Sequence, residues 1–470
     1  MRTIWGVLAV AVAAVAMAPA ARAAGALPGP APWQGPADVA RERGAQFSSA
    51  GAALAADGRG IVVWASRRPG FAITAVDVAA GGALGAPVTL SPPGDRASAP
   101  LVGMAADGEA VVAWHVGPRS RGVSLCIRPA SGGPCAVRRI SLPGRRAILQ
   151  RLAVDVDGSA IVAWVQQTAG GWRAAVAERA PGGPFGRARL VGPPGATAAD
   201  VALGPASATL VFSRLTRRRG LARRGSEIRL ASWLRGEAPA LTRAVSPRGH
   251  VAVTPRVAVD DRDDAIVAWQ RIHGANEFAI AYARIRDCDH VGCTNGPGAL
   301  ARLGALRRLG PRVVRRGRQA STSDLTVSAT GQRLVVGWIH LAGDERSASQ
   351  IRVAQWSGGT LGAPVRASDA GFSGFDPQVV ARGDRTIVIL REYGRPGVRD
   401  GLVVARIADR ASLAFAPPAG LSSPALIQQS AARPRLAVGP SGAALAVFTD
   451  YGAGGSGAGE LALARLAGAV

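Results

Sequence analysis

Apolar residues in this chain fall in short runs that recur at regular spacing and are separated by tight polar turns. The clearest example is Arg151–Trp164 (RLAVDVDGSAIVAW), where two apolar segments flank Asp157-Gly158. Asp tolerates and Gly readily adopts the left-handed backbone conformations that a tight hairpin turn requires. The pattern predicts a β-hairpin whose second strand ends in tryptophan.

The same hairpin recurs from near the N-terminus to the last residues, so the repeats are the strongest evidence for the fold. Each repeat continues with a third apolar segment, a Gly-rich turn and a segment that contains proline, as in 84–90 (LGAPVTL). Proline cannot donate a ladder hydrogen bond, which places that strand at a sheet edge. We therefore expect four-stranded antiparallel sheets with the proline strand outermost, in repeats at about 47–97, 98–147, 148–198, 199–251, 252–319, 320–373, 374–425 and 426–470.

The two ends of the repeat array complement each other. The last repeat stops after its third strand, Glu460–Leu466, whereas Trp33–Val39 (WQGPADV) has the character of a fourth strand and precedes the first hairpin. Pairing these segments closes a ring without an open edge. The expected fold is all-β: a β-propeller of eight blades, with seven left open because the fourth repeat is degenerate. A solenoid is the competing architecture and needs caps at both ends.

The repeat unit (V-A-V-D-x-D-G-x-A-I-V-A-W) resembles repeats of secreted bacterial β-propellers and, distantly, the Asp-box (S-x-D-x-G-x-x-W) of the sialidase-like superfamily. The resemblance covers nearly the whole chain after the first residues and rests on Asp157, Gly158 and Trp164. In the Asp-box the Asp and Gly shape a turn and the Trp packs between blades. The resemblance therefore implies fold rather than activity.

The N-terminus reads as an export signal. An arginine is followed by an apolar run from Ile4 to about Met17 and by Ala21-Arg22-Ala23, a small-residue cleavage site. The run is shorter than the ~20 residues of a spanning helix. We expect a signal peptide at 1–23, a single propeller domain at 24–470, no membrane span, and a monomer that is secreted or located in the periplasm or at the exterior of the cell envelope.

Charge and cysteine content limit the function classes. The net charge is +25, but all 56 basic residues are Arg and they are spread over all repeats with few aromatic neighbours, which argues against a nucleic-acid partner. The absence of Lys excludes a Walker A phosphate loop and Schiff-base chemistry. In an exported protein, Cys126/Cys135 and Cys288/Cys293 are expected as two local disulfides, and a zinc site at Cys288, His290 and Cys293 is the weaker alternative.

Clustered carboxylates raise the question of a metal. Asp155, Asp157 and the run Asp260–Asp264 offer oxygen ligands, but they lack the spaced set of a dedicated calcium loop. Turn formation explains them without a metal. We expect no cofactor, with calcium as the alternative.

The segments after each repeat tryptophan vary in length and are polar, unlike the tryptophans themselves, which occupy an inter-blade packing position. Variable loops on a rigid scaffold are where sites usually lie. The candidate binding residues in or beside these loops are His115, Arg119, Gln166, Trp172, Arg271, His273, His340, Arg391, Tyr393 and Tyr451.

Two function classes remain. The favoured one is a non-catalytic binding or scaffold propeller that engages a glycan, a cell-envelope component or a protein through the post-tryptophan loops. The alternative is a glycoside hydrolase of the sialidase-like class, which needs an Arg cluster, a Tyr nucleophile with an activating Glu, and an acid/base carboxylate. Only Glu392-Tyr393 pairs a Tyr with a neighbouring Glu, so no catalytic residue is assigned.

Overall fold

The computed structural model divides into two units, Met1–Ala31 and Pro32–Val470, and all described residues belong to the second. The described residues are 33–41, 49–66, 70–118, 120–133, 135–216, 225–239, 242–246, 251–273, 277–285, 307–314, 325–331, 333–340, 349–357, 360–394, 402–409, 412–422, 434–450 and 460–467.

The strands of this second unit follow the order that the repeats predict. The first four repeats comprise β2 (Gly51–Leu54), β3 (Gly60–Ser66), β4 (Ala72–Val78), β5 (Val88–Thr89); β6 (Ser98–Met104), β7 (Ala110–Val116), β8 (Gly122–Arg128), β9 (Val137–Arg139); β10 (Ala147–Val154), β11 (Ala160–Thr168), β12 (Gly171–Arg179), β13 (Arg189–Val191); and β14 (Ala196–Leu203), β15 (Ser207–Thr216), β16 (Gly225–Leu234), β17 (Arg243–Ala244).

The last four repeats comprise β18 (Val251–Val259), β19 (Ala265–His273), β20 (Glu277–Ile285), β21 (Arg307–Val314); β22 (Thr326–Thr330), β23 (Arg333–His340), β24 (Gln350–Ser357), β25 (Thr360–Leu361), β26 (Val365–Arg366); β27 (Ser373–Arg382), β28 (Arg385–Tyr393), β29 (Leu402–Asp409), β30 (Ala419–Gly420); and β31 (Arg435–Val438), β32 (Ala444–Asp450), β33 (Glu460–Leu466) with β1 (Gln34–Arg41).

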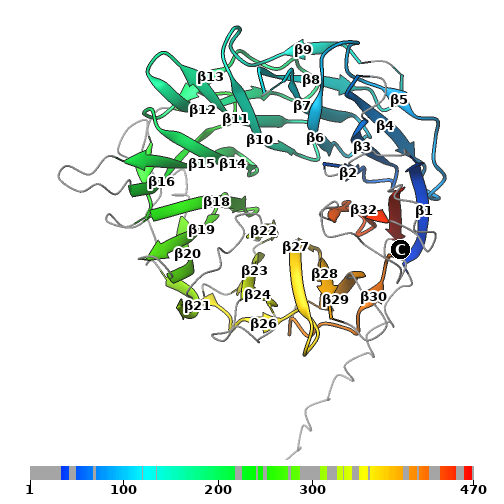
Figure 1. Cartoon of the computed structure of the whole chain (residues 1–470), viewed down its shortest axis with the longest axis vertical. Helices are drawn as coiled ribbons and strands as arrows, with labels where there is room; N and C mark the ends of the chain where they lie inside the picture. The colour runs from blue at the N-terminus through cyan, green and yellow to red at the C-terminus, as the bar shows by residue number, and fades with distance from the viewer. Residues whose placement is uncertain are drawn as a thin grey trace, which may run out of the picture. The chain divides into compact units, whose positions relative to one another are not determined.

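The sheets surround a common centre (Figure 1). Hydrogen bonds group the described strands into seven sheets, one of which has eight strands. That sheet contains two repeats, β14–β17 and β18–β21, joined by a single parallel bridge between Ser226 and Val251. The described strands thus form eight repeats, seven of four strands and one of five, β22–β26. The innermost strands β2, β6, β10, β14, β18, β22, β27 and β31 contact one another in that order, with β31 returning to β2.

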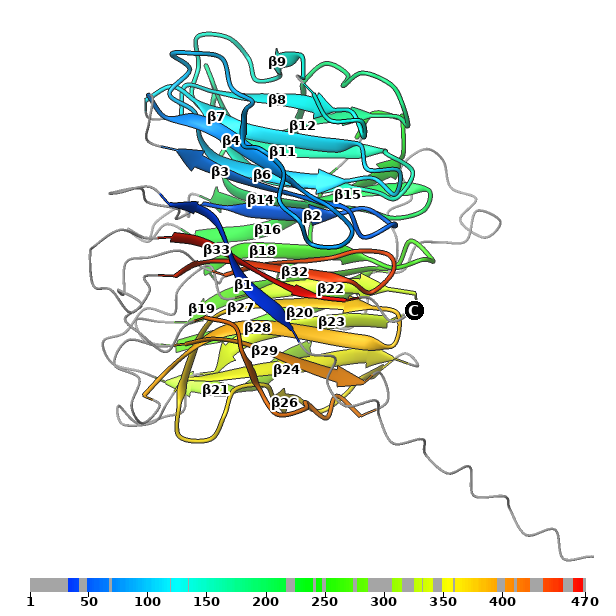
Figure 2. The same cartoon turned by 90° about the vertical axis from the view of Figure 1, so that its right-hand side faces the viewer.

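The ring closes through the two ends of the chain, as the sequence predicts. Strand β1 pairs antiparallel with β33, with Ala37 opposite Leu463 and Asp38 opposite Ala462. Figure 2 shows the dark-blue β1 beside the dark-red β33. The first strand of the chain therefore completes the last repeat and covers an edge that would otherwise be open. The architecture is a β-propeller.

The core lies between neighbouring repeats, because each sheet is covered on both faces. The second strand of a repeat is consequently buried throughout, as in Ile161–Val165. Trp64, Trp114, Trp164, Trp269 and Trp338 are at most 3% exposed and pack in the inter-repeat clusters. Since aromatic side chains bury a large apolar area, these residues hold adjacent repeats together.

The turns between first and second strands use the predicted chemistry. Gly158 adopts φ +85°, and the Asp157 carboxylate accepts the backbone N–H of Ser159 at 2.8 Å. Asp57 and Asp107 make the same bond to residues 59 and 109 at 2.9 Å. The carboxylates close turns, which explains their recurrence without a metal.

Candidate ligand-binding rim

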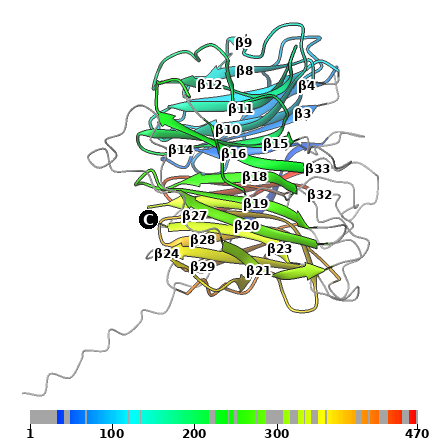
Figure 3. The same ribbon diagram turned by 90° about the vertical axis from the view of Figure 1, so that its left-hand side faces the viewer.

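Strand direction sorts the connections onto two sides of the ring. The strands run largely along its axis (Figures 2 and 3). In a four-stranded antiparallel sheet, the turns from strand one to two and from three to four lie at one end. The loops from strand two to three and the connections between repeats lie at the other end. We call these ends the turn rim and the loop rim.

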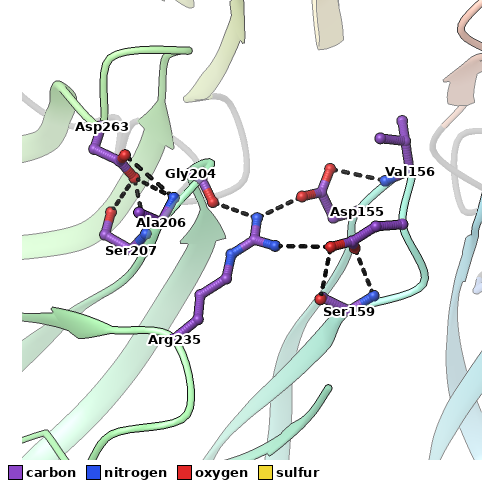
Figure 4. A network of polar contacts seen from close by, with 9 residues as sticks. Asp155, Val156, Ser159, Gly204, Ala206, Ser207, Arg235 and Asp263 are labelled. Carbon is purple, nitrogen blue, oxygen red and sulfur yellow. Dashed lines mark hydrogen bonds and ion pairs between the residues drawn. The ribbon is translucent and has the colours of Figure 1, made fainter. Parts of the chain in front are cut away.

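Arginine binds neighbouring repeats together along the turn rim. Arg235 of the fourth repeat donates to Asp155 and Asp157 of the third and to the Gly204 carbonyl (Figure 4). Asp263 of the fifth repeat accepts both Ser207 N–H (2.9 Å) and Ser207 O–H (2.6 Å) from the fourth. Part of the large Arg content thus has a structural role. The Asp263 carboxylate likewise joins the fifth repeat to the fourth through hydrogen bonds.

A partly exposed tryptophan, Trp172, lies at the loop rim in the third repeat and packs against the core between the third and fourth repeats. The Arg146 guanidinium carbon lies 5.7 Å from the Trp172 ring centroid. Arg146 comes from the connection into this repeat, and Trp172 follows Gly171, whose φ of +112° belongs to the tight turn between β11 and β12. Phe71 holds the position equivalent to Trp172 in the first repeat and is 43% exposed.

Gln166 is not at the surface, so the prediction that it binds a ligand is wrong. Strand β11 continues beyond Trp164 to Thr168, so Gln166 lies in the sheet and not in a loop, and its side chain is fully buried. Its amide oxygen accepts from Trp164 Nε1 at 3.0 Å and from Leu142 N–H at 3.1 Å, while its nitrogen donates to the Arg146 carbonyl at 3.0 Å. Gln166 therefore positions Arg146 and cannot reach a ligand at the surface.

The seventh repeat brings Arg391 and Tyr393 together with two residues that the sequence analysis missed. Arg391 forms an ion pair with Asp376, and its guanidinium carbon lies 5.6 Å from the Tyr393 ring centroid. The ring of Phe375 meets the Tyr393 ring edge-on, with centroids 5.3 Å apart. Phe375 and Tyr393 are partly exposed whereas Asp376 is 6% exposed, so the surface of this group consists of two aromatic rings with Arg391 beside them.

The local backbone explains how Asp376 reaches Arg391. A bulge interrupts the pairing of β27 with β28 between Phe375 and Gln378, and Asp376 adopts φ +49° directly before Pro377. A non-glycine residue in this conformation is strained, and such strain is concentrated at functional sites. The same Xaa-Pro bulge occurs at Ala99-Pro100 and Thr254-Pro255, and this recurrence is the sequence signal that points to Asp376.

The predicted histidines at the loop rim have different surroundings. His115 Nε2 accepts the Leu149 N–H at 2.7 Å, which ties the second repeat to the innermost strand of the third. Burial lowers the pKa of His115 below its usual value, and the accepting nitrogen must be unprotonated. Burial and the neighbouring Arg352 also lower the pKa of His340. Both imidazoles are therefore neutral groups, and His115 has a structural bond.

Of the remaining predicted residues, only Arg271 has a described side chain. Arg271 is 8% exposed, so it is a buried residue rather than a surface contact. His273 ends β19, and its side chain lies outside the described part of the structure, as do Arg119 and Tyr451. Cys126 and Cys135 form a disulfide, whereas Cys288 and Cys293 lie outside the described residues.

The described part of the chain has neither a metal-binding cluster nor a membrane-spanning helix. No group of three or more His, Cys, Asp or Glu side chains there is placed to hold a metal ion. No helix among those residues is long and apolar enough to cross a membrane.

Comparisons with known proteins give the fold alone. The chain matches no protein-family profile and no curated protein sequence. Its structure is similar to the BP39L lectin from Burkholderia pseudomallei (TM-score 0.49, 14% identity, 80% of this chain and 99% of that one). It is also similar to a puromycin-hydrolyzing peptidase from Mycobacterium tuberculosis, with a TM-score of 0.47 and 15% identity over 90% of this chain and 62% of that one. A PL25 ulvan lyase has a TM-score of 0.45 and 10% identity over 78% of this chain and 96% of that one. Specific function is not resolved by these likenesses.

Proposed function

We propose that this protein is an exported, non-catalytic binding propeller that holds a glycan through its loop rim. The observations that carry the proposal are two separate aromatic–arginine pairs at this rim, Trp172 with Arg146 in the third repeat and Tyr393 with Arg391 in the seventh, where Phe375 adds a second ring. Phe71 adds an exposed ring in the first repeat. The C–H faces of sugars pack on aromatic rings, and guanidinium and carboxylate groups hydrogen-bond sugar hydroxyls. A cell-envelope component or a protein remains the other class of partner.

The scaffold favours a preorganised site. Trp172 and Tyr393 lie at the ends of long paired strands, and Gln166 and Gln167 together hold the Arg146 carbonyl through bonds of 3.0 and 2.8 Å. Side chains fixed in this way lose little conformational freedom when a ligand binds. Loops that differ between repeats also give the asymmetric surface that a specific partner requires.

The export signal in the first 23 residues supports a location outside the cytoplasm, either secreted or at the cell envelope. The Cys126–Cys135 disulfide fits an oxidising compartment. Both observations support an extracellular or envelope molecule as the proposed ligand.

The sialidase-like alternative requires Glu392 to activate Tyr393. Adjacent strand residues point to opposite faces, and Glu392 is fully buried with a carboxylate oxygen accepting the Asp369 N–H at 2.8 Å. Tyr393 lies on the opposite face beside Arg391, which is already paired with Asp376. This arrangement favours binding over hydrolysis.

A screen of the exported protein against glycans, isolated envelope polymers and envelope proteins tests the proposal. Retention of one glycan class is expected, with loss of retention in Trp172→Ala or Tyr393→Ala. Val156→Ala, which shortens an exposed apolar side chain on the turn rim, is the matched control. Retention of proteins only would refute the glycan class, and release of free sugar from a retained glycan would establish the hydrolase instead.

A further inference from the structure

A cleft of about 310 Å³ opens on the turn rim, between the first and second repeats. This volume is at the lower end of the range of about 300–1,000 Å³ for small-molecule sites. Its walls come from both repeats and include the apolar side chains of Ile61, Leu84 and Met104 and the charged groups Arg59, Asp77 and Arg128. The cleft is thus separate from the loop rim.

Arg128 is the unusual group in this wall. Its side chain is 4% exposed, and its Nη2 donates to Asp77 of the first repeat at 2.5 Å. Its Nη1 is buried and has no hydrogen-bond partner among the described residues. A buried guanidinium with an unused donor is costly and calls for an explanation.

A second guanidinium lines the same cleft. Arg59 donates to Asp57 at 2.5 Å and to the carbonyl oxygens of Ala130 and Asp107 at 3.2 Å each. Asp57 balances Arg59, and Asp77 balances Arg128 only in part, because Asp77 is half exposed to water. Among the charged groups that line the cleft, two guanidinium groups thus face one carboxylate, Asp77.

Two features shape the part of the cleft wall that carries Arg128: the backbone conformation of Gly132 and the Cys126–Cys135 disulfide. Gly132 has φ +79°, a backbone conformation that side-chain-bearing residues rarely adopt, and a Cβ there would lie in ordinary contact with Arg128 Nη2 and Asp77 Oδ2 at 3.7 Å each. The turn 128–132 lies inside the loop closed by the Cys126–Cys135 disulfide. The disulfide restrains the position of Arg128 against the first repeat.

The next boundary around the ring is built differently. Arg179 holds the position equivalent to Arg128, since each pairs with the first residue of its neighbouring strand. It donates to Glu109 at 2.6 Å and to the Gly183 carbonyl at 2.9 Å, and Phe185 is buried in the core between the second and third repeats. The cleft at the first boundary is therefore not a general consequence of the repeat.

We propose that this cleft binds a small carboxylate-bearing molecule with an apolar body. The carboxylate lies beside the guanidinium groups of Arg128 and Arg59, because carboxylate oxygens match guanidinium donors in charge and geometry. The apolar body packs against Leu84 and Met104. The ligand is either a free acid or the acidic end of a longer chain.

Calorimetric titration of the full exported protein with hexanoate and benzoate tests this site, with hexanamide and benzamide as neutral controls. Binding of the acids and not of the amides is expected. Arg128→Gln should weaken acid binding about tenfold or more, the loss expected for a charge-assisted hydrogen bond. Asp77→Asn should strengthen it, because it removes the carboxylate that competes for Arg128.

The matched control is Arg179→Gln, which removes the equivalent guanidinium at the next boundary, outside the cleft lining, and should leave acid binding unchanged. Ala130→Leu, which fills the cleft without removing a charge, should abolish binding in a protein that still folds. Equal binding of acids and amides, or unchanged binding in Arg128→Gln, would overturn the proposal, as would no binding to the folded protein. Acids extended by a long polyether tail distinguish a chain end from a free acid.

Discussion

The guanidinium carbon of Arg391 lies 5.6 Å from the centroid of the Tyr393 ring, and both residues belong to the last three positions of β28. The ion pair of Arg391 with Asp376 fixes the guanidinium from the neighbouring strand. A cation over an aromatic ring is attracted to its face. The pair is therefore held in place before any ligand arrives.

The backbone strain at Asp376 should lower the free energy of unfolding. Replacing it with Ala removes the ion pair and keeps a side chain at φ +49°, whereas Gly removes the ion pair and relieves the strain. We expect Asp376→Gly to be about 1 kcal/mol more stable than Asp376→Ala in chemical unfolding. Equal stabilities would mean that the backbone at this bulge is not strained.

Gln166 should behave as a structural residue. Gln166→Ala leaves the Trp164 and Leu142 N–H groups without their acceptor, and the cost of buried unsatisfied groups is about 1–3 kcal/mol. Gln150→Ala, which removes only contacts of 3.3–3.4 Å to nearby carbonyls, is the control. Unfolding in urea measures both, and similar losses in the two variants would argue against the assigned role.

Stability should fall as the pH drops below about 6.5, the ordinary histidine pKa. The folded pKa of His115 is lowered by burial, so in this range the unfolded chain binds more protons than the folded one, and protonation favours unfolding. His115→Asn should flatten this dependence, and His340→Asn should remove a further part. An unchanged slope in both variants, measured by unfolding between pH 5 and 8, would show that neither histidine is responsible.

Ring closure depends on β1. Deleting residues 24–46 exposes the edge of β33, so we expect a lower melting temperature and concentration-dependent aggregation. Deletion of residues 24–32, which leaves β1 intact, is the control. A shortened protein that melts like the control would contradict closure by strand pairing.

The disulfide should stabilise a local turn. Cys126→Ser with Cys135→Ser opens a loop with a sequence separation of 9 residues, and we expect a loss of about 2 kcal/mol. Non-reducing peptide mapping of the exported protein should show the link between these two cysteines. Full retention of stability in the double variant would leave the bond without a structural role.

The repeat fold was predictable because each repeat carries its own signals. Asp157-Gly158 predicts a hairpin turn, and Trp164 predicts a buried strand end. The last repeat lacks its fourth strand, which predicts that Trp33–Val39 closes the ring. Recurrence of these signals across the chain made the β-propeller prediction independent of any one copy. The eight-stranded sheet shows only that a single bridge joins two of the repeats.

The site was only partly predictable, because its contacts join residues from different loops. Trp172, Arg391 and Tyr393 were predicted to lie in loops, and the structure places them at the loop-rim ends of β12 and β28. Arg146 meets Trp172 from the preceding inter-repeat connection, and no sequence pattern links them. Gln166 looked exposed because the length of β11 depends on pairing with β12, which the sequence does not reveal.

The central claim is that the loop rim, and not the turn rim, carries the proposed glycan site. The most direct test is paired melting and binding curves for two sets of alanine variants, Phe71, Trp172, Arg391 and Tyr393 against Asp57, Asp107 and Asp157, with the glycan found in the screen. Loop-rim variants should remain folded while at least one loses about 1–2 kcal/mol of binding free energy, and turn variants should melt earlier and bind normally. Folded turn variants that lose the glycan, together with loop-rim variants that keep it, would contradict the account.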